Sequence, residues 1–102
     1  MASRDDGVAV HYTALERGTP VFSSDGQEVG KVDQVLDNYR EAIFDGLVIE
    51  TPSGERKFVD APEVERTAER AVTLNITAAQ VAELDPPPAG GGATRRLFRR
   101  RR

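Results

Sequence analysis

The densest apolar run of the chain lies between residues 43 and 50, and it predicts a central β-strand. β-Branched and aromatic residues surround one glycine and two acids there, and turn-forming residues flank the run at 38–40 and 51–54. These flanks limit the run to strand length, so strand is favoured over helix. We expect Gly46 to let the strand bend, and the rest of the chain to pack against it.

The apolar residues of this run fall into two alternating phases. One holds Ile43, Leu47 and Ile49, and the other holds Phe44 and Val48. Because successive side chains of a strand point to opposite faces, both faces offer apolar surface. We therefore expect one face to fill a core and the other to meet the C-terminal helix or a second subunit.

Weaker apolar runs on either side predict further strands, at residues 18–22, 28–36, 55–60 and 71–74. Asp25-Gly26 joins the first two as a hairpin turn, since aspartate hydrogen-bonds the local backbone and glycine accepts positive φ. The alternation slips within the second run, which indicates a bulge or sharp bend near Gly30. A strongly bent strand of this kind is typical of a closed or nearly closed barrel.

A short helix is predicted after the last strand. Thr77 and Gln80 have the capping-box spacing, in which both side chains satisfy unpaired donors at a helix start. The helix is expected to run to about Leu84, because the prolines at 86–88 cannot continue it. The predicted fold is mainly β, a small antiparallel barrel with a short C-terminal helix.

Composition divides the chain into four parts: a flexible leader at 1–11, one domain at 12–85, a Pro/Gly-rich linker at 86–94 and an arginine-rich tail at 95–102. The net charge of −3 hides an asymmetry between them. All seventeen acids and eight of the fourteen basic residues lie in residues 1–85, so this part carries −9 and the tail carries +6. Such a tail cannot fold alone, and we expect it to be disordered and to attract polyanions.

The order of these signals resembles the PRC-barrel family of small β-barrels. The matching residues are Gly18-Thr19-Pro20-Val21, Asp25-Gly26, Val29-Gly30-Lys31-Val32, Val35, Gly46-Leu47-Val48-Ile49, Phe58-Val59, Val64 and Val72-Thr73-Leu74. The resemblance covers about Tyr12 to Leu84, and the chain is most similar to the stand-alone bacterial members. It implies a PRC-type barrel that is used mainly for protein contacts rather than for chemistry.

The residues needed for nucleophilic catalysis are scarce in this sequence. It contains no cysteine, and its single histidine, His11, lies in the predicted leader. Glu63 and Glu65 would share one strand face and could serve acid–base work or hold a hard cation, although solvated surface explains such pairs in an acidic domain. We therefore expect no enzyme, no cofactor, no metal and no small-molecule substrate, with a carboxylate- or metal-dependent enzyme as the alternative.

The tail is the feature that calls for a partner. Its candidate polyanion-binding residues are Arg95, Arg96, Phe98, Arg99, Arg100, Arg101 and Arg102. Six arginines could contact nucleic-acid phosphates while Phe98 stacks on a base. They could instead meet an anionic membrane, or lie on an acidic barrel, their own or a neighbour's. A structural barrel with a solvated tail that has no target is the remaining alternative.

The sequence thus predicts a non-enzymatic protein-interaction or adaptor module whose tail docks on RNA, DNA or an anionic membrane. A core of this size is small, which favours a homodimer alongside a protein partner. The absence of cysteines, of a signal-peptide run and of a membrane-spanning run leads us to expect a cytoplasmic protein. The residues expected in the barrel core or a dimer contact are Val32, Ile43, Phe44, Leu47, Val48, Ile49 and Phe58.

Overall fold

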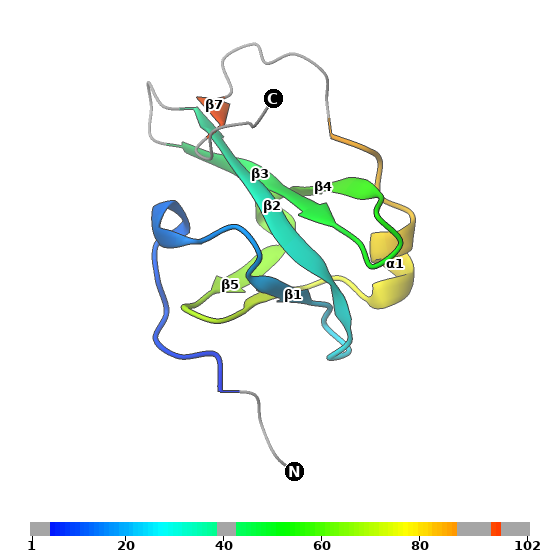
Figure 1. Cartoon of the computed structure of the whole chain (residues 1–102), viewed down its shortest axis with the longest axis horizontal. Coiled ribbons are helices and arrows are strands. Elements are labelled where there is room, and N and C mark those ends of the chain that lie inside the picture. Colours follow the sequence, from blue (N-terminus) through cyan, green and yellow to red (C-terminus); the bar gives the residue numbers. More distant parts are fainter. Residues whose placement is uncertain (1–4, 39–42, 88–94, 97–102) are drawn as a thin grey trace.

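The computed structural model describes residues 5–38, 43–87 and 95–96. The elements are two 3-10 helices, η1 (Tyr12–Ala14) and η2 (Ala61–Glu63), one helix, α1 (Ala78–Ala82), and the strands β1 (Pro20–Phe22), β2 (Glu28–Asn38), β3 (Ile43–Glu50), β4 (Arg56–Asp60), β5 (Val64–Thr67), β6 (Val72–Leu74) and β7 (Arg95–Arg96). Six strands follow the order β4-β3-β2-β1-β6-β5, and β7 pairs with β2 beside this path (Figure 1). The predicted mainly β fold with a short C-terminal helix is therefore confirmed.

The sheet curls into a half-barrel. Strands β4 and β5 stand at opposite ends of the strand order, yet only the three residues of η2 separate them in the chain. So short a connection brings the two ends of the sheet close together, and the sheet must bend around a core to allow it. Pro62, the middle residue of η2, lacks a backbone donor and interrupts the ladder at this corner.

One strand pair corrects the expectation of a purely antiparallel barrel. Strands β1 and β6 run parallel, whereas every other pairing of the described strands is antiparallel. The reason lies at η2, which joins β4 to β5 without a hairpin reversal. Strand β5 therefore keeps the sense of β4, and β6 returns in the sense of β1, so the sheet is mixed.

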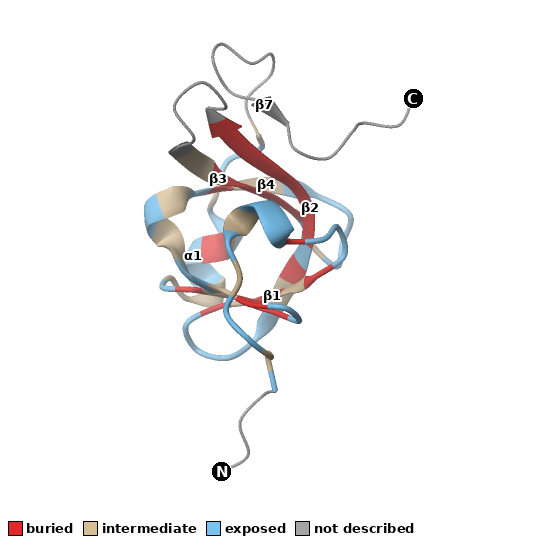
Figure 2. Cartoon of the chain, turned by 90° about the vertical axis from the view of Figure 1, so that its left-hand side faces the viewer, coloured by how far each residue is buried: buried red, intermediate tan, exposed pale blue. Residues whose placement is uncertain are grey.

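The core fills the inside of the curl. Its fully buried side chains come from all six strands of the path except β5, and they are Val21, Val32, Val35, Leu47, Ile49, Val59, Val72 and Leu74. Val81, the buried residue of α1, joins them, so the short helix covers part of this core. In Figure 2 the buried colour follows β2 along most of its length, which makes β2 the most enclosed strand.

Bulges decide which face each residue of β2 and β3 takes. The register jumps between Val32 and Gln34, and it jumps again where Leu36 and Asp37 of β2 face Gly46 and Phe44 of β3. The second jump leaves Asp45 as the extra residue, so Phe44 lies on the face of Leu47 rather than on that of Val48. The prediction that Phe44 and Val48 lie on the same face of the strand was therefore wrong.

The outer face of β3 is closed by a side chain of β4. The Phe58 ring lies over Gly46, where a methyl group would come within 2.9 Å of the ring carbons. Gly46 has φ of +155°, a conformation that is essentially restricted to glycine. Val48, two residues along on this face, is 2 % exposed. The sequence-based role of Gly46 is thus refined from a bend to a close approach of two strands.

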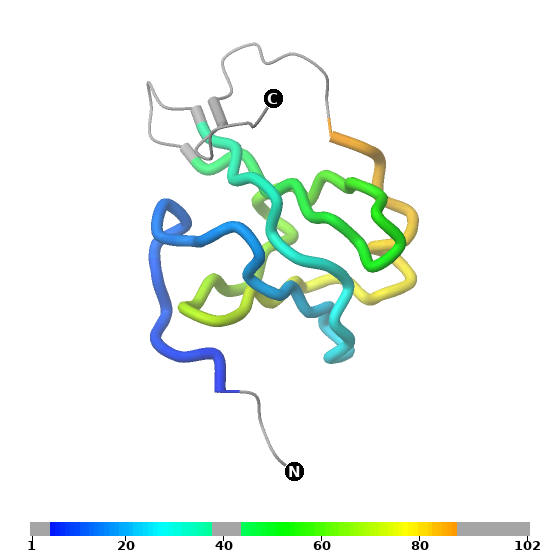
Figure 3. The backbone as a smooth tube through the Cα atoms, viewed as in Figure 1, coloured from blue at the N-terminus to red at the C-terminus, as the bar shows by residue number. Residues whose placement is uncertain are grey.

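Residues 5–10 differ from the flexible leader that we expected. They run alongside β5 and the turn that follows it (Figure 3), where the N–H of Val10 donates to the carbonyl of Thr67 at 3.0 Å. The N–H of Glu69 donates in turn to the carbonyl of Val8 at 3.0 Å, and Asp6 pairs with Arg66 at 3.3 Å. The free edge of β5 explains this docking, because its backbone groups gain partners there.

Helix α1 is anchored to the first hairpin. Thr77 and Gln80 form the predicted capping box, with the N–H of Gln80 donating to the Thr77 hydroxyl at 3.2 Å. Across the turn, Asp25 Oδ1 accepts the N–H of Ala78 at 3.2 Å and is also bonded to the Ser23 hydroxyl. The hairpin that the sequence predicts therefore also holds the start of the helix.

Candidate functional site

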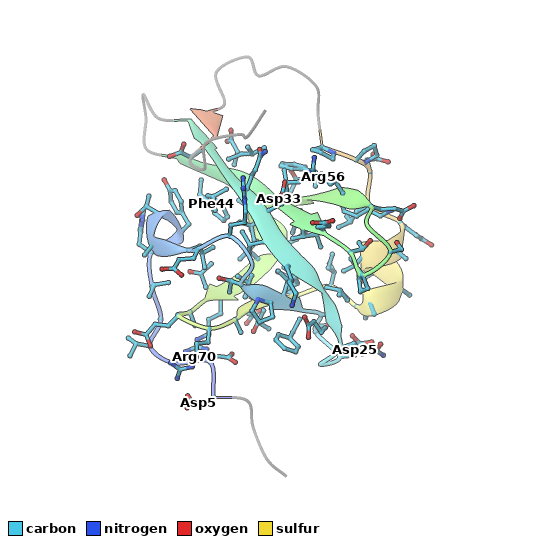
Figure 4. All side chains as sticks on the ribbon, viewed as in Figure 1. Asp5, Asp25, Asp33, Phe44, Arg56 and Arg70 are labelled. Carbon is cyan, nitrogen blue, oxygen red and sulfur yellow. The ribbon has the colours of Figure 1, made fainter. Side chains whose placement is uncertain are left out.

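An aromatic cluster lies where η1 meets the start of β3. The Tyr12 and Phe44 rings stack with centroids 4.6 Å apart and planes 15° from parallel, and the His11 ring packs against Tyr12 at 4.2 Å. In Figure 4 the labelled Phe44 lies beside η1. A pocket of about 280 Å³ opens between this cluster and β5. We call His11, Tyr12 and Phe44 the aromatic cluster.

Local bonds hold the cluster in place. His11 caps η1, since its Nδ1 accepts the backbone N–H of Thr13 at 3.3 Å and lies 2.9 Å from the Thr13 hydroxyl. This cap fixes Tyr12 at the first helical position, from which its ring reaches Phe44 on β3. The single histidine of the chain is thus accounted for by a structural role.

Two acids surround Tyr12. Its hydroxyl donates a hydrogen bond to the carboxylate of Asp37, the neighbour of Phe44 across the β2–β3 ladder. Burial raises the pKa of Tyr12 above its usual value, and the negative charges of Asp37 and Asp45 raise it further. This end of the half-barrel therefore combines aromatic faces with negative charge, a combination that attracts arginine and lysine side chains.

The Asp37 side chain is buried, which is unusual for a carboxylate. It is 5 % exposed, and its Oδ1 atom has no hydrogen-bond partner among the described residues. A buried oxygen without a partner carries a desolvation cost that a bound donor would remove. Asp37 is therefore the residue of this site with the clearest unmet demand for a ligand.

Asp33, four residues earlier on β2, is a second buried acid whose Oδ2 accepts no hydrogen bond from the described residues, but two arginines lie close to it. Its Oδ2 lies 3.4 Å from Nε of Arg56, and its Oδ1 lies 3.9 Å from Nε of Arg17 (Figure 4). The same Arg17 nitrogen also donates to the Asp33 carbonyl at 3.0 Å. Two arginines thus neutralise Asp33, which has a structural role.

Strand β7 brings the arginine tail to β2. Its residues pair antiparallel with β2, Arg95 opposite Asp37 and Arg96 opposite Leu36. The ladder to β1 covers the opposite end of the same edge, from Glu28 to Lys31, and leaves this end open. Of the predicted polyanion-binding residues, Arg95 and Arg96 therefore have a described backbone, whereas Phe98 and the arginines at 99–102 lie outside the described residues.

The residues predicted for the core or a dimer contact divide into three groups. Val32, Leu47 and Ile49 are buried in the core, and Val48 is buried on the opposite face of β3. Phe44 and Phe58 are half-buried. The side chain of Ile43 lies outside the described part of the structure.

The proposed carboxylate pair does not form. Glu63 is the last residue of η2 rather than part of a strand, and its Oε1 accepts the N–H of Asp60 at 3.2 Å. Glu65 lies on β5 and is exposed. The structural turn at η2 thus separates two acids that the sequence pattern placed on one face.

A second pocket, of about 470 Å³, lies at the other end of β2 and β3. Glu28, Gly30, Lys31 and Glu50 contribute to its lining, and Lys31 pairs with Glu28 at 3.0 Å. Its charged residues Glu28, Lys31 and Glu50 are exposed to solvent, so it has less to offer a ligand than the buried Asp37. Within residues 5–38, 43–87 and 95–96, no three His, Cys, Asp or Glu side chains gather as a metal site would require.

Sequence reasoning missed the aromatic cluster and Asp37. Tyr12 and Phe44 are far apart in the chain, and only the curl of the sheet brings them together. Asp37 directly follows the strand predicted at 28–36, and nothing in the sequence distinguishes it from the other acids of the chain. Its burial, which is unusual for an aspartate, is seen only in the structure.

Fold and site together define a small, mainly β half-barrel. A family model matches residues 15–82, and the protein belongs to that family, DUF2171, described as an uncharacterized protein conserved in bacteria. The match spans β1 to α1, so His11, Tyr12 and the arginine tail lie outside it. No curated protein sequence matches the chain. None of the helices described here is long and apolar enough to cross a membrane.

Proposed function

We propose that this protein is a non-enzymatic interaction module of the PRC-barrel type, whose arginine tail docks it on a phosphate-rich polyanion. The observation that carries the proposal is the separation of charge. Six of the fourteen basic residues stand within the last eight positions, while residues 1–85 carry −9. A guanidinium group binds a phosphate through two parallel hydrogen bonds, so clustered arginines suit nucleic acids and anionic lipid surfaces.

The body of the protein supports a binding role by what it presents. The pocket beside the aromatic cluster is lined by apolar and polar side chains, and the acids near Tyr12 add charge selectivity. The PRC-barrel resemblance points in the same direction, because that family uses its barrels for protein contacts. The proposal includes a homodimer and a cytoplasmic location, and light scattering at micromolar concentration tests the homodimer.

The experiment compares the full chain with a version that ends at Thr94. This truncation removes all six tail arginines but keeps Asp85, whose carbonyl accepts the N–H of Phe58 at 2.9 Å and helps to hold β4. Binding is measured to single-stranded RNA, to duplex DNA and to vesicles that contain anionic lipid, each at two salt concentrations. A full-length variant with all six arginines changed to lysine serves as the charge-matched control.

We expect the full chain to bind at least one polyanion and the truncated chain to lose that binding. For duplex DNA the log–log salt slope should approach about −5, the value for six phosphate contacts. The lysine variant should keep most of the slope and lose part of the affinity. Equal binding by the full and truncated chains at low salt would rule out the role of the tail.

A further inference from the structure

We infer that the open end of the β2 edge, around Leu36 and Asp37, is a docking site for this chain's own arginine tail, residues 95–102. The first observation is the backbone ladder itself, in which β7 adds to β2 at the end that β1 leaves open. An extended segment that joins a free sheet edge gains main-chain hydrogen bonds whatever its sequence. The ladder therefore explains why this edge takes a strand.

Side-chain chemistry explains why the β2 edge binds an arginine-rich strand. Asp37 is buried, and its Oδ1 has no described hydrogen-bond partner. Directly opposite residues of an antiparallel pair share a face, so the register places position 95 on the face of Asp37. A guanidinium is the donor that satisfies such an oxygen best, because the hydrogen bond is assisted by charge.

The surroundings favour a cation over other donors. Asp45 adds a second negative charge near Tyr12, and the stacked rings of Tyr12 and Phe44 offer aromatic surface beside it. Asp33 and Asp37 each have one buried oxygen without a hydrogen-bond partner, but Asp33 has Arg17 and Arg56 within 4 Å, whereas no cation of the described residues forms an ion pair with Asp37. Residues 1–85 carry a net charge of −9 and the tail carries +6, so the two parts of the chain attract each other.

Docking in this way would regulate the proposed function, and this second half of the inference rests on that function. Arginines held at Asp37 are not free for phosphates, so the acidic end of the half-barrel competes with the polyanion. The apparent affinity for the polyanion equals the intrinsic affinity multiplied by the fraction of molecules whose tail is undocked. If the tail is docked about 90 % of the time, polyanion binding weakens about tenfold.

The docking is tested with a spin label on the tail of the full chain. The sequence contains no cysteine, so Thr94→Cys provides a unique attachment site and keeps all six arginines. In an isotope-labelled sample at low salt, the amide signals of Leu36 and Asp37 should lose intensity. They should recover near 0.5 M salt, where the screening length is a few Å. Undiminished signals at low salt overturn the docking.

Three variants make the assignment specific. Asp37→Asn keeps the shape of the residue but removes its charge, and we expect it to restore the signals. Arg95→Ser changes a residue of the tail instead of a buried residue of β2. It should therefore also restore the signals, even if Asp37→Asn impairs folding. Glu28→Gln makes the same charge change on the same strand at its other end and should restore nothing. Loss of signal that neither Asp37→Asn nor Arg95→Ser relieves would overturn the role of these two residues.

A mixed sample separates the chain's own tail from that of a second copy. Spin-labelled protein without isotope is added to isotope-labelled protein without spin label, so signal loss reports only contacts between molecules. We expect none, and loss at Leu36 would assign the docked tail to a second copy instead. The competition is tested by titrating a single-stranded RNA into wild type and Asp37→Asn, with several-fold tighter binding expected for the variant.

The outcomes of these experiments are distinguishable. Equal RNA affinity of wild type and Asp37→Asn, with the spin-label effect present, overturns the competition but not the docking. Failure of the truncated chain to differ from the full chain overturns the proposed polyanion function and leaves the spin-label result untouched.

Discussion

Replacing Gly46 with alanine should destabilise this domain far more than the same change at another glycine of positive φ. Gly46 has φ of +155°, and a Cβ atom there would collide with the Val59 carbonyl oxygen and approach the Phe58 ring to 2.9 Å. Gly54 has φ of +94°, but nothing lies within 4 Å of its Cβ position. The two substitutions therefore share backbone strain and differ in steric collision.

The magnitudes follow from these two terms. A residue held in a sparsely populated backbone region costs about 1–3 kcal/mol, and forcing extra volume into a packed site costs about 1–3 kcal/mol more. Gly46→Ala should thus cost about 2–6 kcal/mol, which rivals the roughly 3–5 kcal/mol that a core of this size supplies. Gly54→Ala should cost about 1–2 kcal/mol.

Urea unfolding of the full chain, followed by circular dichroism, measures the difference. With a slope of about 1 kcal/mol per molar urea, Gly54→Ala should move the midpoint by about 1–2 M and leave a cooperative transition. Gly46→Ala should move the midpoint by about 2 M or more, and at the upper end of its cost it should leave most molecules unfolded before urea is added. The double variant with Phe58→Leu should recover little, because the Val59 carbonyl remains. Equal costs at Gly46 and Gly54 would refute the close approach of β3 and β4.

Three further changes test other parts of the structure. Val48→Asp should unfold the domain, since Val48 is 2 % exposed and an unpaired buried charge costs several kcal/mol. With Asp25→Asn, the free energy of unfolding should fall less steeply than that of wild type as the pH is lowered. The Ser23 hydroxyl lowers the pKa of Asp25 below 3.8, so its stabilisation is present above that pH and is lost as the pH falls through the lowered value. With Tyr12→Phe, the free energy of unfolding should fall less steeply than that of wild type as the pH is raised. Burial and the Asp37 charge raise the pKa of Tyr12 above 10.0, so its stabilisation is full below that pH and is lost as the pH rises through the raised value.

Each of these changes has its own check. Val8→Asp is the control for Val48, because Val8 is 67 % exposed and the change should cost no more than about 0.5 kcal/mol. A folded monomeric Val48→Asp would show that this face of β3 meets a partner rather than the protein interior. For Asp25 and Tyr12, urea midpoints are compared with wild type across pH. Curves that stay parallel to wild type would contradict the assigned hydrogen bonds.

The sequence by itself determined the features that depend on neighbouring residues. The central strand at 43–50, the Asp25-Gly26 hairpin and the Thr77–Gln80 cap all appear where the pattern places them. Each follows from a short-range preference, such as glycine at positive φ or a hydroxyl at a helix start, and no distant residue is needed to state it. The separation of charge between body and tail is likewise a property of composition alone.

Tertiary structure decided the rest, because it depends on which distant segments pair. The bulge at Asp45 reverses the face of Phe44, and only the ladder to β2 reveals it. The parallel β1–β6 pair arises from the path of the chain at η2, which closes the curl. The same curl brings Tyr12 onto Phe44 and beside Asp37. Asp33 and Asp37 are both buried with one unpartnered oxygen, and the arginines beside Asp33 leave Asp37 as the centre of the candidate site. Burial and neighbouring cations are properties that a residue acquires only in the folded chain.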